Sequence, residues 1–336
     1  FGHLPITDDD FHEINHLHSH LRSIYPNTVI QYFGGHSHIR DFAVFDDKST
    51  GLQSGRFCET VGFLSIDGVT DDSPKFSRRY IDFNMRSFMH HTGVSKVPDF
   101  HTKKGLEISD AIEVLRDTLN LTEVVGYIPQ SYYMYSKPID SHKNIYNFLT
   151  SKVLPRLRSD ATDDSKTRFI MINTGSIRYD LHKGKFTKDT EYIVSPFPND
   201  WNYIEIPLSL ATEVETYLNN GDVIMKNMAP PGFTQNFMDT RANRCPFIRD
   251  PSLTKGYTTL DDFGCDGDDT PHNTELYYAV PNVVQSVEVK PNGGEIVHFV
   301  FYSFIQPSIL DALNNLNKRE KVVDHYFTNS DCKLYG

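Results

Sequence analysis

Residues 28–38 read TVIQYFGGHSH, and this stretch decides the fold that we expect for the first part of the chain. The run TVIQYF is β-branched and aromatic, which is typical of a buried strand. The strand passes directly into two glycines and then into polar residues. In open α/β sheets, sites are built at the carboxyl ends of strands. We therefore expect His36 and His38 to lie at the edge of a sheet, where a ligand can bind.

The two histidines of this stretch favour a metal site. His36 and His38 are separated by one residue, so on an extended loop their imidazoles point in different directions and can serve two ions of a close pair. Neutral imidazole is a common donor for zinc-like and manganese-like ions. A polar loop with two exposed histidines is the alternative, but the buried strand and the glycines favour metal binding. His3, in GHLP, is a second candidate metal ligand, and it is a candidate only in combination with residues 34–38.

The composition excludes several classes of function. The 336 residues include 23 Phe and 18 Tyr, which is too many large apolar groups for a disordered chain. Lys plus Arg number 33 and Asp plus Glu 44, so the formal charge is -11 and the basic footprint of a nucleic-acid-binding protein is lacking. No apolar run approaches the roughly 18 residues of a membrane span. At roughly 150 residues per domain, the length predicts about two domains.

Helical and strand patterns alternate along the chain, which predicts the α/β or α+β class. Residues 11–24 and 106–119 place apolar side chains at three- and four-residue steps, as amphipathic helices do. The stretch 97–105 contains Pro, Gly and charged residues and is a candidate domain boundary. Strands are further expected at 41–45, 57–66, 79–85, 168–172, 190–194, 202–206, 283–289 and 295–302, and helices at 142–158, 209–219 and 307–317.

Two motifs in the second part are candidates for ligand binding. The sequence NTGSIR, from Asn173 to Arg178, follows the apolar run RFIMI. Backbone N–H groups of such a turn and a guanidinium fork both suit phosphate or carboxylate, although an ordinary strand-to-turn connection is the alternative. Phe197 stands between two prolines in SPFPN. A rigid loop can present its ring for stacking, or the ring can belong to the core.

Two further patterns are weaker indications of metal binding. His12, His16 and His20 lie at four-residue steps on the first helix, which favours a solvated helix face over a metal site. Residues 264–269 form a Gly-rich acidic stretch that could bind calcium, but it lacks the spacing and the terminal Glu of an EF-hand.

The cysteines and one glycosylation sequon indicate the cellular compartment of the protein. The four cysteines show no CxxC spacing, which argues against a structural zinc site. Cys245 and Cys265 can pair, and Asn120 begins a glycosylation sequon. We therefore expect the secretory pathway, with a vacuolar or extracellular destination.

Taken together, these motifs resemble the C-terminal portion of the 5'-nucleotidase family of binuclear metallophosphoesterases, in order and over nearly the whole chain. GHLP followed by FGGHSH is similar to the last two metal-binding motifs of the calcineurin-like phosphoesterase domain. NTGSIR followed by SPFPN is similar to the start of the family's C-terminal substrate domain. Uncharacterised fungal members resemble the chain in its FGGHSHIRD and DDFGCDGDDT stretches as well.

The resemblance implies an α/β fold with three parts. Residues 1–98 would be the C-terminal part of a metallophosphoesterase α/β sandwich. Residues 99–121 would form a connecting helix. Residues 122–336 would form an α/β 5'-nucleotidase-type domain that binds the substrate.

The resemblance also implies roles for single residues. His3 and His36 would bind one divalent ion and His38 the other, with zinc or manganese as the expected metals. In the second part, the substrate's phosphate or nearby polar groups would be held by Asn173 and Arg178, and a base would stack on Phe197.

In the family, a metal-activated water attacks phosphorus, so the resemblance implies a metal-dependent hydrolase of nucleotides or related phosphomonoesters. The family's other ligands and its catalytic His lie in the motifs DxH, GDxxD and GNHE, which belong upstream of GHLP. GDxxD and GNHE do not occur in this sequence, and its DxH tripeptides all lie downstream of GHLP. Three neutral histidines cannot hold two cations that repel each other. We therefore expect no catalytic residue in this chain, and we expect the N-terminal half of the same protein, upstream of Phe1, as its partner.

Two positions depart from the family pattern. Asp268 stands where the family has the second aromatic ring of a base-stacking clamp. The stretch SYYMYSKPIDSHKN contains no Arg, so Lys137 and His142 are its cationic candidates for phosphate recognition. These departures leave open nucleoside monophosphates, dinucleotides, nucleotide sugars and other phosphoesters as substrates. They also leave open a non-catalytic nucleotide-binding module derived from the same fold.

Overall fold

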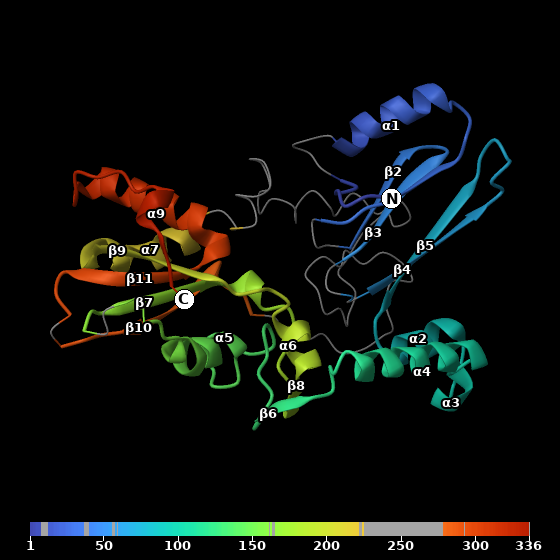
Figure 1. Cartoon of the computed structure of the whole chain (residues 1–336). Helices are drawn as coiled ribbons and strands as arrows, with labels where there is room; N and C mark the ends of the chain where they lie inside the picture. The colour runs from blue at the N-terminus through green and yellow to red at the C-terminus, as the bar shows by residue number, and fades with distance from the viewer. Residues whose placement is uncertain are drawn as a thin grey trace. The chain divides into compact units, whose positions relative to one another are not determined.

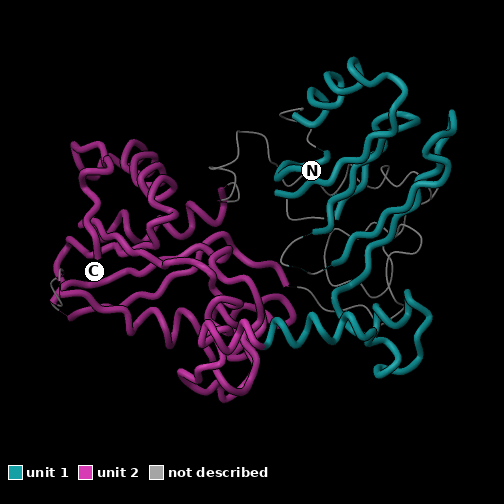
Figure 2. Tube along the Cα trace, turned by 45° about the vertical axis from the view of Figure 1, so that its right-hand side comes forward, with its two compact units in different colours: residues 1–113, 232–275 teal, residues 114–231, 276–336 magenta. Residues whose placement is uncertain are grey.

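The computed structural model describes residues 1–7, 13–36, 40–55, 58, 60–160, 162, 165–221, 224, 278–291 and 293–335. Figure 2 shows the two compact units of the chain. Among the described residues, unit 1 takes in Phe1–Glu113 and unit 2 the remainder. Within this described part, no helix has both the length and the apolar character that crossing a membrane requires.

Unit 1 contains two small sheets. Strand β1 pairs in parallel with β3, which pairs antiparallel with β2, and β4 and β5 form an antiparallel pair. The elements run in the order α1 (Glu13–Ile24), β1 (Ile30–Phe33), β2 (Arg40–Asp46), β3 (Ser49–Ser54), β4 (Thr60–Asp67), β5 (Lys75–Asp82), α2 (Met85–Thr92) and α3 (Val97–Phe100).

Among the described residues of unit 1, Phe42, Leu52 and Tyr80 form a buried apolar cluster, and Ile6, Ile14 and Tyr32 are buried as well. Two buried arginines lie over the rings of this cluster: Arg78 covers Phe42 and Tyr80, and Arg40 covers Tyr80.

Unit 2 is built around a five-stranded mixed sheet in the order β10-β7-β11-β9-β12. Strands β7 and β11 are parallel, and the other neighbours are antiparallel. Figure 1 shows α7 and α9 on one face of this sheet and α5 on the other. The bounds are α5 (Ile145–Phe148), β7 (Arg168–Asn173), β9 (Trp201–Pro207), α7 (Leu208–Asn220), β10 (Val283–Glu288), β11 (Ile296–Tyr302), α9 (Gln306–Glu320) and β12 (Lys333–Leu334).

A long helix and a small ribbon complete the chain. Helix α4 (Lys103–Thr118) contains the boundary between the two units. Strands β6 (Val124–Ile128) and β8 (Gly184–Thr187) pair antiparallel, and α6 (Lys188–Val194) follows β8 directly. In unit 2, the apolar side chains of the large sheet and its helices form one extensive core that includes Phe299, Leu210 and Leu313.

The predicted α/β class is confirmed, but the strand predicted at 190–194 is wrong because these residues belong to helix α6. The run Tyr-Ile-Val favoured a strand by propensity. The start of the helix overrides it: the Thr187 hydroxyl accepts from the Thr190 N–H, and the Thr190 side chain accepts from the Thr187 N–H. Asp189 in the first turn further stabilises the helix through its dipole.

Other boundaries differ for local reasons. The helix predicted at 142–158 begins at Ile145, where Asn144 caps it, and continues as a π turn and a 3₁₀ turn as far as Arg156. Strand β5 ends at Asp82 because Asn84 caps α2 by accepting from Ser87 N–H. The spacing of apolar residues did not predict β3, α2, α3, β6, β8 or β12.

Candidate metal and substrate sites

Two of the three histidines predicted to bind metal face each other in unit 1. Nδ1 of His36 lies 3.3 Å from Nε2 of His3. The ring centroids are 5.1 Å apart, and the ring planes are inclined by 81°. The contact between the two nitrogens has the geometry of a hydrogen bond, and it holds the two imidazoles next to each other. The structure therefore places His3 of the GHLP motif beside His36 of the FGGHSH motif.

Backbone hydrogen bonds hold the two motifs side by side. The Gly2 N–H donates to the Phe33 carbonyl at 3.0 Å, and the Gly35 N–H donates to the Leu4 carbonyl at 2.9 Å. At Gly34 a Cβ would lie 2.6 Å from the Leu4 carbonyl oxygen, so a side chain there would push the two segments apart. Gly34 is thus required by this close approach.

His36 itself is conformationally strained. Its φ is 76°, in the left-handed region that costs a residue with a side chain roughly 1–2 kcal/mol. Such strain persists where surrounding structure holds it, and it clusters at functional sites. The turn that carries His36 therefore has the local character of a ligand-binding loop.

Of the other residues predicted to bind metal or to form a disulfide, some lie outside the described residues and some are exposed. His38 and His12 lie outside the described residues, as do Cys245, Cys265 and the acidic stretch 264–269 with Asp268. His16 and His20 are exposed on α1, as expected for a solvated helix face. Among the residues that the structure describes, no three His, Cys, Asp or Glu side chains are grouped so that they could hold a metal ion.

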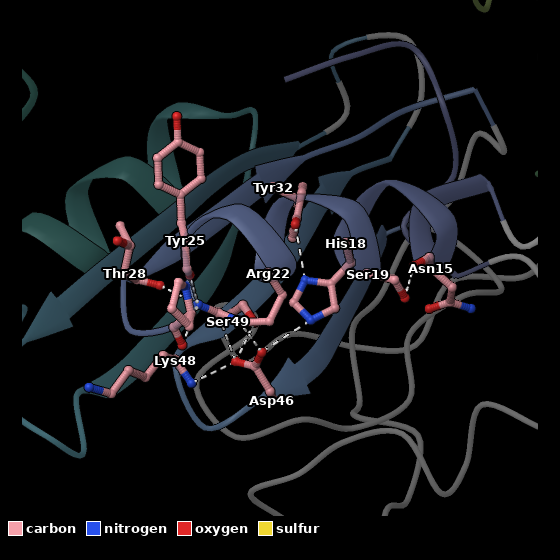
Figure 3. Close-up of polar contacts among 11 residues, drawn as sticks. Asn15, His18, Ser19, Arg22, Tyr25, Thr28, Tyr32, Asp46, Lys48 and Ser49 are labelled. Carbon is pink, nitrogen blue, oxygen red and sulfur yellow. Dashed lines mark hydrogen bonds and ion pairs between the residues drawn. The ribbon is translucent and has the colours of Figure 1, made fainter.

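A polar cluster centred on Asp46 attaches α1 to the sheet of unit 1 (Figure 3). The guanidinium of Arg22 donates to both carboxylate oxygens of Asp46, from Nε at 2.8 Å and from Nη2 at 3.1 Å. Nε2 of His18 lies 3.1 Å from the same carboxylate, and Nδ1 of His18 lies 3.0 Å from the Tyr32 hydroxyl. Tyr32 belongs to β1, so the cluster ties α1 to the strand that leads to His36.

Hydrogen bonds lower the pKa of Asp46. Burial alone would raise this pKa, but donors on Ser49, Arg22 and the Lys48 backbone outweigh burial and hold it at about 2, below the ordinary 3.8. Because the folded pKa lies below the unfolded one, the carboxylate stabilises the fold above about pH 4, and this contribution disappears as the pH falls toward 2.

We expect Asp46→Asn to lower the midpoint of thermal unfolding at pH 6 and to differ little from the wild type near pH 2. Circular dichroism melts at intervals between these pH values measure the difference. Asp47→Asn, which changes the exposed neighbouring residue, is the matched control and should follow the wild type throughout. A deficit of the Asp46 variant that is the same at every pH would contradict the role given to the charge.

In unit 2, Arg178 and Phe197 lie against each other. The Cζ atom of Arg178 is 5.0 Å from the centroid of the Phe197 ring, within the range of a cation–π contact. The Arg178 N–H donates to the carbonyl of Val194 at 2.8 Å. Because Val194 ends α6 and the SPFPN loop follows it, this backbone bond brings the NTGSIR turn beside the loop that carries the ring.

Asn173 ends strand β7 at the start of the same turn. Its side chain is buried, and among the described residues its Oδ1 has no hydrogen-bond partner. Asn199 follows Phe197 closely and has a φ of 55°, and its Oδ1 is likewise buried with no hydrogen-bond partner in the described part of the chain. A buried acceptor without a donor is costly, so a ligand or a bound water is the natural partner of each.

Sequence reasoning missed Tyr302 in this region. Burial raises the pKa of Tyr302, the Asp200 carboxylate raises it further and the Arg178 guanidinium lowers it, so both charged groups lie near the hydroxyl. Tyr302 ends β11 and pairs with Trp201 at the start of β9. Tyr302 lies here because of the register between β9 and β11, which are far apart in sequence. No sequence motif predicts that register. Of the other cationic candidates, Lys137 is half-buried and His142 exposed.

Comparison with known proteins identifies the family. The model of the NAD nucleotidase C-terminal domain matches residues 131–310, a range that contains both NTGSIR and SPFPN. An uncharacterised protein of Saccharomyces cerevisiae is 51% identical over 350 residues, covering 100% of this chain and 58% of the relative. A secreted protein of Arthroderma benhamiae is 34% identical over 392 residues, covering 96% of this chain and 58% of the relative. The chain thus spans a little under three fifths of these relatives.

A solved structure agrees with the family model. The crystal structure of 5'-nucleotidase from Candida albicans SC5314 superposes with a TM-score of 0.73 and is 43% identical, over 100% of this chain and 59% of that one. The resemblance drawn from the motifs is therefore confirmed. The chain belongs to the 5'-nucleotidase family and carries the family's NAD nucleotidase C-terminal domain.

Proposed function

We propose that this chain is the C-terminal part of a metal-dependent phosphoester hydrolase of the 5'-nucleotidase type, which acts on nucleotides or related phosphomonoesters. The observation that carries the proposal is the 3.3 Å separation of His36 Nδ1 and His3 Nε2. Two imidazole nitrogens that bind one tetrahedral ion at about 2.0–2.1 Å lie about 3.3 Å from each other. The pair therefore fits two ligands of one divalent ion, zinc or manganese, and we assign His38 to a second ion.

The donors of this pair are not a complete binuclear site. Two cations held close together need carboxylates to offset their repulsion, and the described residues contain no larger donor group. The relatives carry about two fifths of their length outside the match. We assign the remaining ligands and the catalytic residues to an N-terminal half in that additional length, and we call the chain joined to that half the full-length protein.

We assign residues 1–98 to part of a metallophosphoesterase domain, 99–121 to a connecting helix and 122–336 to the substrate domain. When bound, the ions would supply an activated water and would stabilise the charge on the transferred phosphoryl group.

In unit 2, the substrate is assigned to the surface beside the NTGSIR turn. The Arg178 guanidinium suits a phosphate through two parallel hydrogen bonds. The buried Oδ1 of Asn173 can accept from a hydroxyl or amine of the ligand. The guanidinium covers Phe197 from one side and the half-buried ring packs against the core, so we assign a stacked base to the part of the ring that stays exposed.

The cellular route is proposed from two observations. One relative is named a secreted protein. The sequon residue Asn120 is exposed, as an acceptor for glycosylation must be. We infer passage through the secretory pathway to the vacuole or the cell exterior, as a glycoprotein.

A thermal-shift panel tests the binding part of the proposal. Nucleoside monophosphates and NAD at ten times their Kd should raise the Tm of the 336-residue chain by about 3 °C, with little further effect of manganese or zinc. The full-length protein should in addition hydrolyse a ligand from the panel when metal is present. Shifts without turnover in the full-length protein would identify a binding module instead. A panel without any shift would contradict the substrate site in unit 2.

A further inference from the structure

Residues 2–7, which read GHLPIT and are here called the strap, cross the three-stranded sheet of unit 1. The two backbone hydrogen bonds described above join the strap to the end of β1 and to the glycines that follow it. His3 belongs to the strap, and its side chain is exposed. Burial therefore does not fix this imidazole, and its place beside His36 depends on how firmly the strap is held.

Ile6 anchors the strap in the sheet. Its side chain is buried, with 1% of the residue exposed. Two glycines, one directly after β1 and one in β3, make room for it. A Cβ at Gly34 would lie 2.5 Å from Cγ2 of Ile6, and a Cβ at Gly51 would lie 3.2 Å from both Cβ and Cγ2 of Ile6. Moving Ile6 out of this space would expose apolar area and leave a cavity, so the fit holds the strap in place.

A hydrogen bond between side chains fixes the end of the strap. The Thr7 hydroxyl donates to Oδ2 of Asp41, the second residue of β2. Asp41 is buried, and its Oδ1 accepts from the Phe42 N–H at 2.9 Å. A buried carboxylate is costly unless donors surround it, so breaking the bond to Thr7 is unfavourable. The strap is thus attached at β1, β3 and β2 in turn.

We propose that Ile6, Thr7 and Asp41 are positioning residues of the metal site, which hold the strap so that His3 can share an ion with His36. The inference rests on the function proposed above. The three residues act through the backbone of the strap rather than by contact with the ion. Groups that orient metal ligands contribute about 10–100-fold to metal affinity, and an exposed ligand on a loose segment would lack that contribution.

The metal affinity of the full-length protein tests the proposal. The Kd values for zinc and manganese are measured by competition with a fluorescent chelator, well below the Tm. Thr7→Val removes the hydroxyl and nearly keeps the size of the side chain, and it should raise the Kd by about 10- to 100-fold. Thr7→Ser keeps the hydroxyl and should restore most of the affinity.

Ser49→Ala is the matched control. It also removes a hydroxyl that donates to a carboxylate of unit 1, that of Asp46, but it does not touch the strap. Both Ser49→Ala and Thr7→Val should lower the Tm, because each leaves a carboxylate with one donor fewer. Only Thr7→Val should change the Kd for metal. A purely structural role of Thr7 would lower the Tm and leave the Kd unchanged.

Two results would overturn the role of the strap and leave the proposed function intact. One is wild-type metal affinity in a folded Thr7→Val variant, and the other is an equal loss of affinity in Ser49→Ala. If Thr7→Val does not fold, Ile6→Val replaces it: the variant removes one methyl group from the fitted space and should raise the Kd severalfold, and an unchanged Kd would overturn the strap. A wild-type full-length protein that binds neither zinc nor manganese would overturn the metal site itself, and the strap with it.

Discussion

Replacing His36 by alanine in the full-length protein is expected to lower its metal-dependent phosphatase kcat by at least about 100-fold. Loss of residues that merely orient metal ligands already costs about 10–100-fold, and His36 is proposed to bind the ion directly. Its nitrogen lies 3.3 Å from that of His3, so the remaining imidazole would lose its partner on the same ion. Hydrolysis of a phosphomonoester in the presence of manganese or zinc measures the rate, and elemental analysis measures the metal retained.

His16→Ala is the matched control for this variant. His16 is exposed on α1, and its removal should leave both rate and metal content unchanged. An unfolded variant is recognised by its circular dichroism spectrum. His3→Ala should reproduce the defect of His36→Ala if both side chains bind one ion. Full activity and full metal content in either variant would contradict the metal site.

Replacing Arg178 by alanine is expected to lower kcat/KM for the nucleotide substrate by about 10- to 100-fold. Hydrogen bonds to a charged group contribute about 1.5–3 kcal/mol, and each 1.4 kcal/mol is a factor of ten. Steady-state kinetics of the full-length protein measure the loss, and the Kd of the 336-residue chain for the same nucleotide should rise in parallel. Arg178 lies over Phe197, so the variant also removes the group that covers one face of that ring.

Two further variants sharpen this measurement. Arg178→Lys keeps the charge but loses the planar fork, so an intermediate defect is expected. Arg158→Ala removes an arginine that is half-exposed and pairs with Glu288 at the surface, and it should leave kcat/KM unchanged. Wild-type kinetics for Arg178→Ala would contradict the assignment of the phosphate to this turn.

Continuous apolar runs made much of unit 2 predictable from sequence. The strands predicted at 168–172, 202–206 and 295–302 correspond to β7, β9 and β11. Strand β7 is buried throughout, β11 is buried after its first residue, and β9 is buried at Tyr203, Ile204 and Ile206. Strand β3 reads STGLQS and was not predicted, because its polar residues are buried by neighbouring strands rather than by their own hydrophobicity. Helix α6 was mistaken for a strand because hydrogen bonds at its first turn outweigh β-branched propensity.

In the candidate sites, too, local motifs were predictable from the sequence, whereas contacts between residues far apart in sequence were not. The order of GHLP and FGGHSH predicts the pairing of His3 with His36, and the turn pattern NTGSIR predicts an anion site at Arg178. The approach of Tyr302 to Arg178 depends on the register of β9 with β11, a contact between residues far apart in sequence.

The central claim is that this chain holds part of a metal site whose other ligands lie in the N-terminal half. Hydrolysis of nucleoside monophosphates, measured side by side for the 336-residue chain and the full-length protein at equal concentration with added manganese or zinc, tests it most directly. The full-length protein should release phosphate and stop when the metal is chelated, and the 336-residue chain should release none above the metal blank. Robust metal-dependent hydrolysis by the 336-residue chain alone would contradict the account.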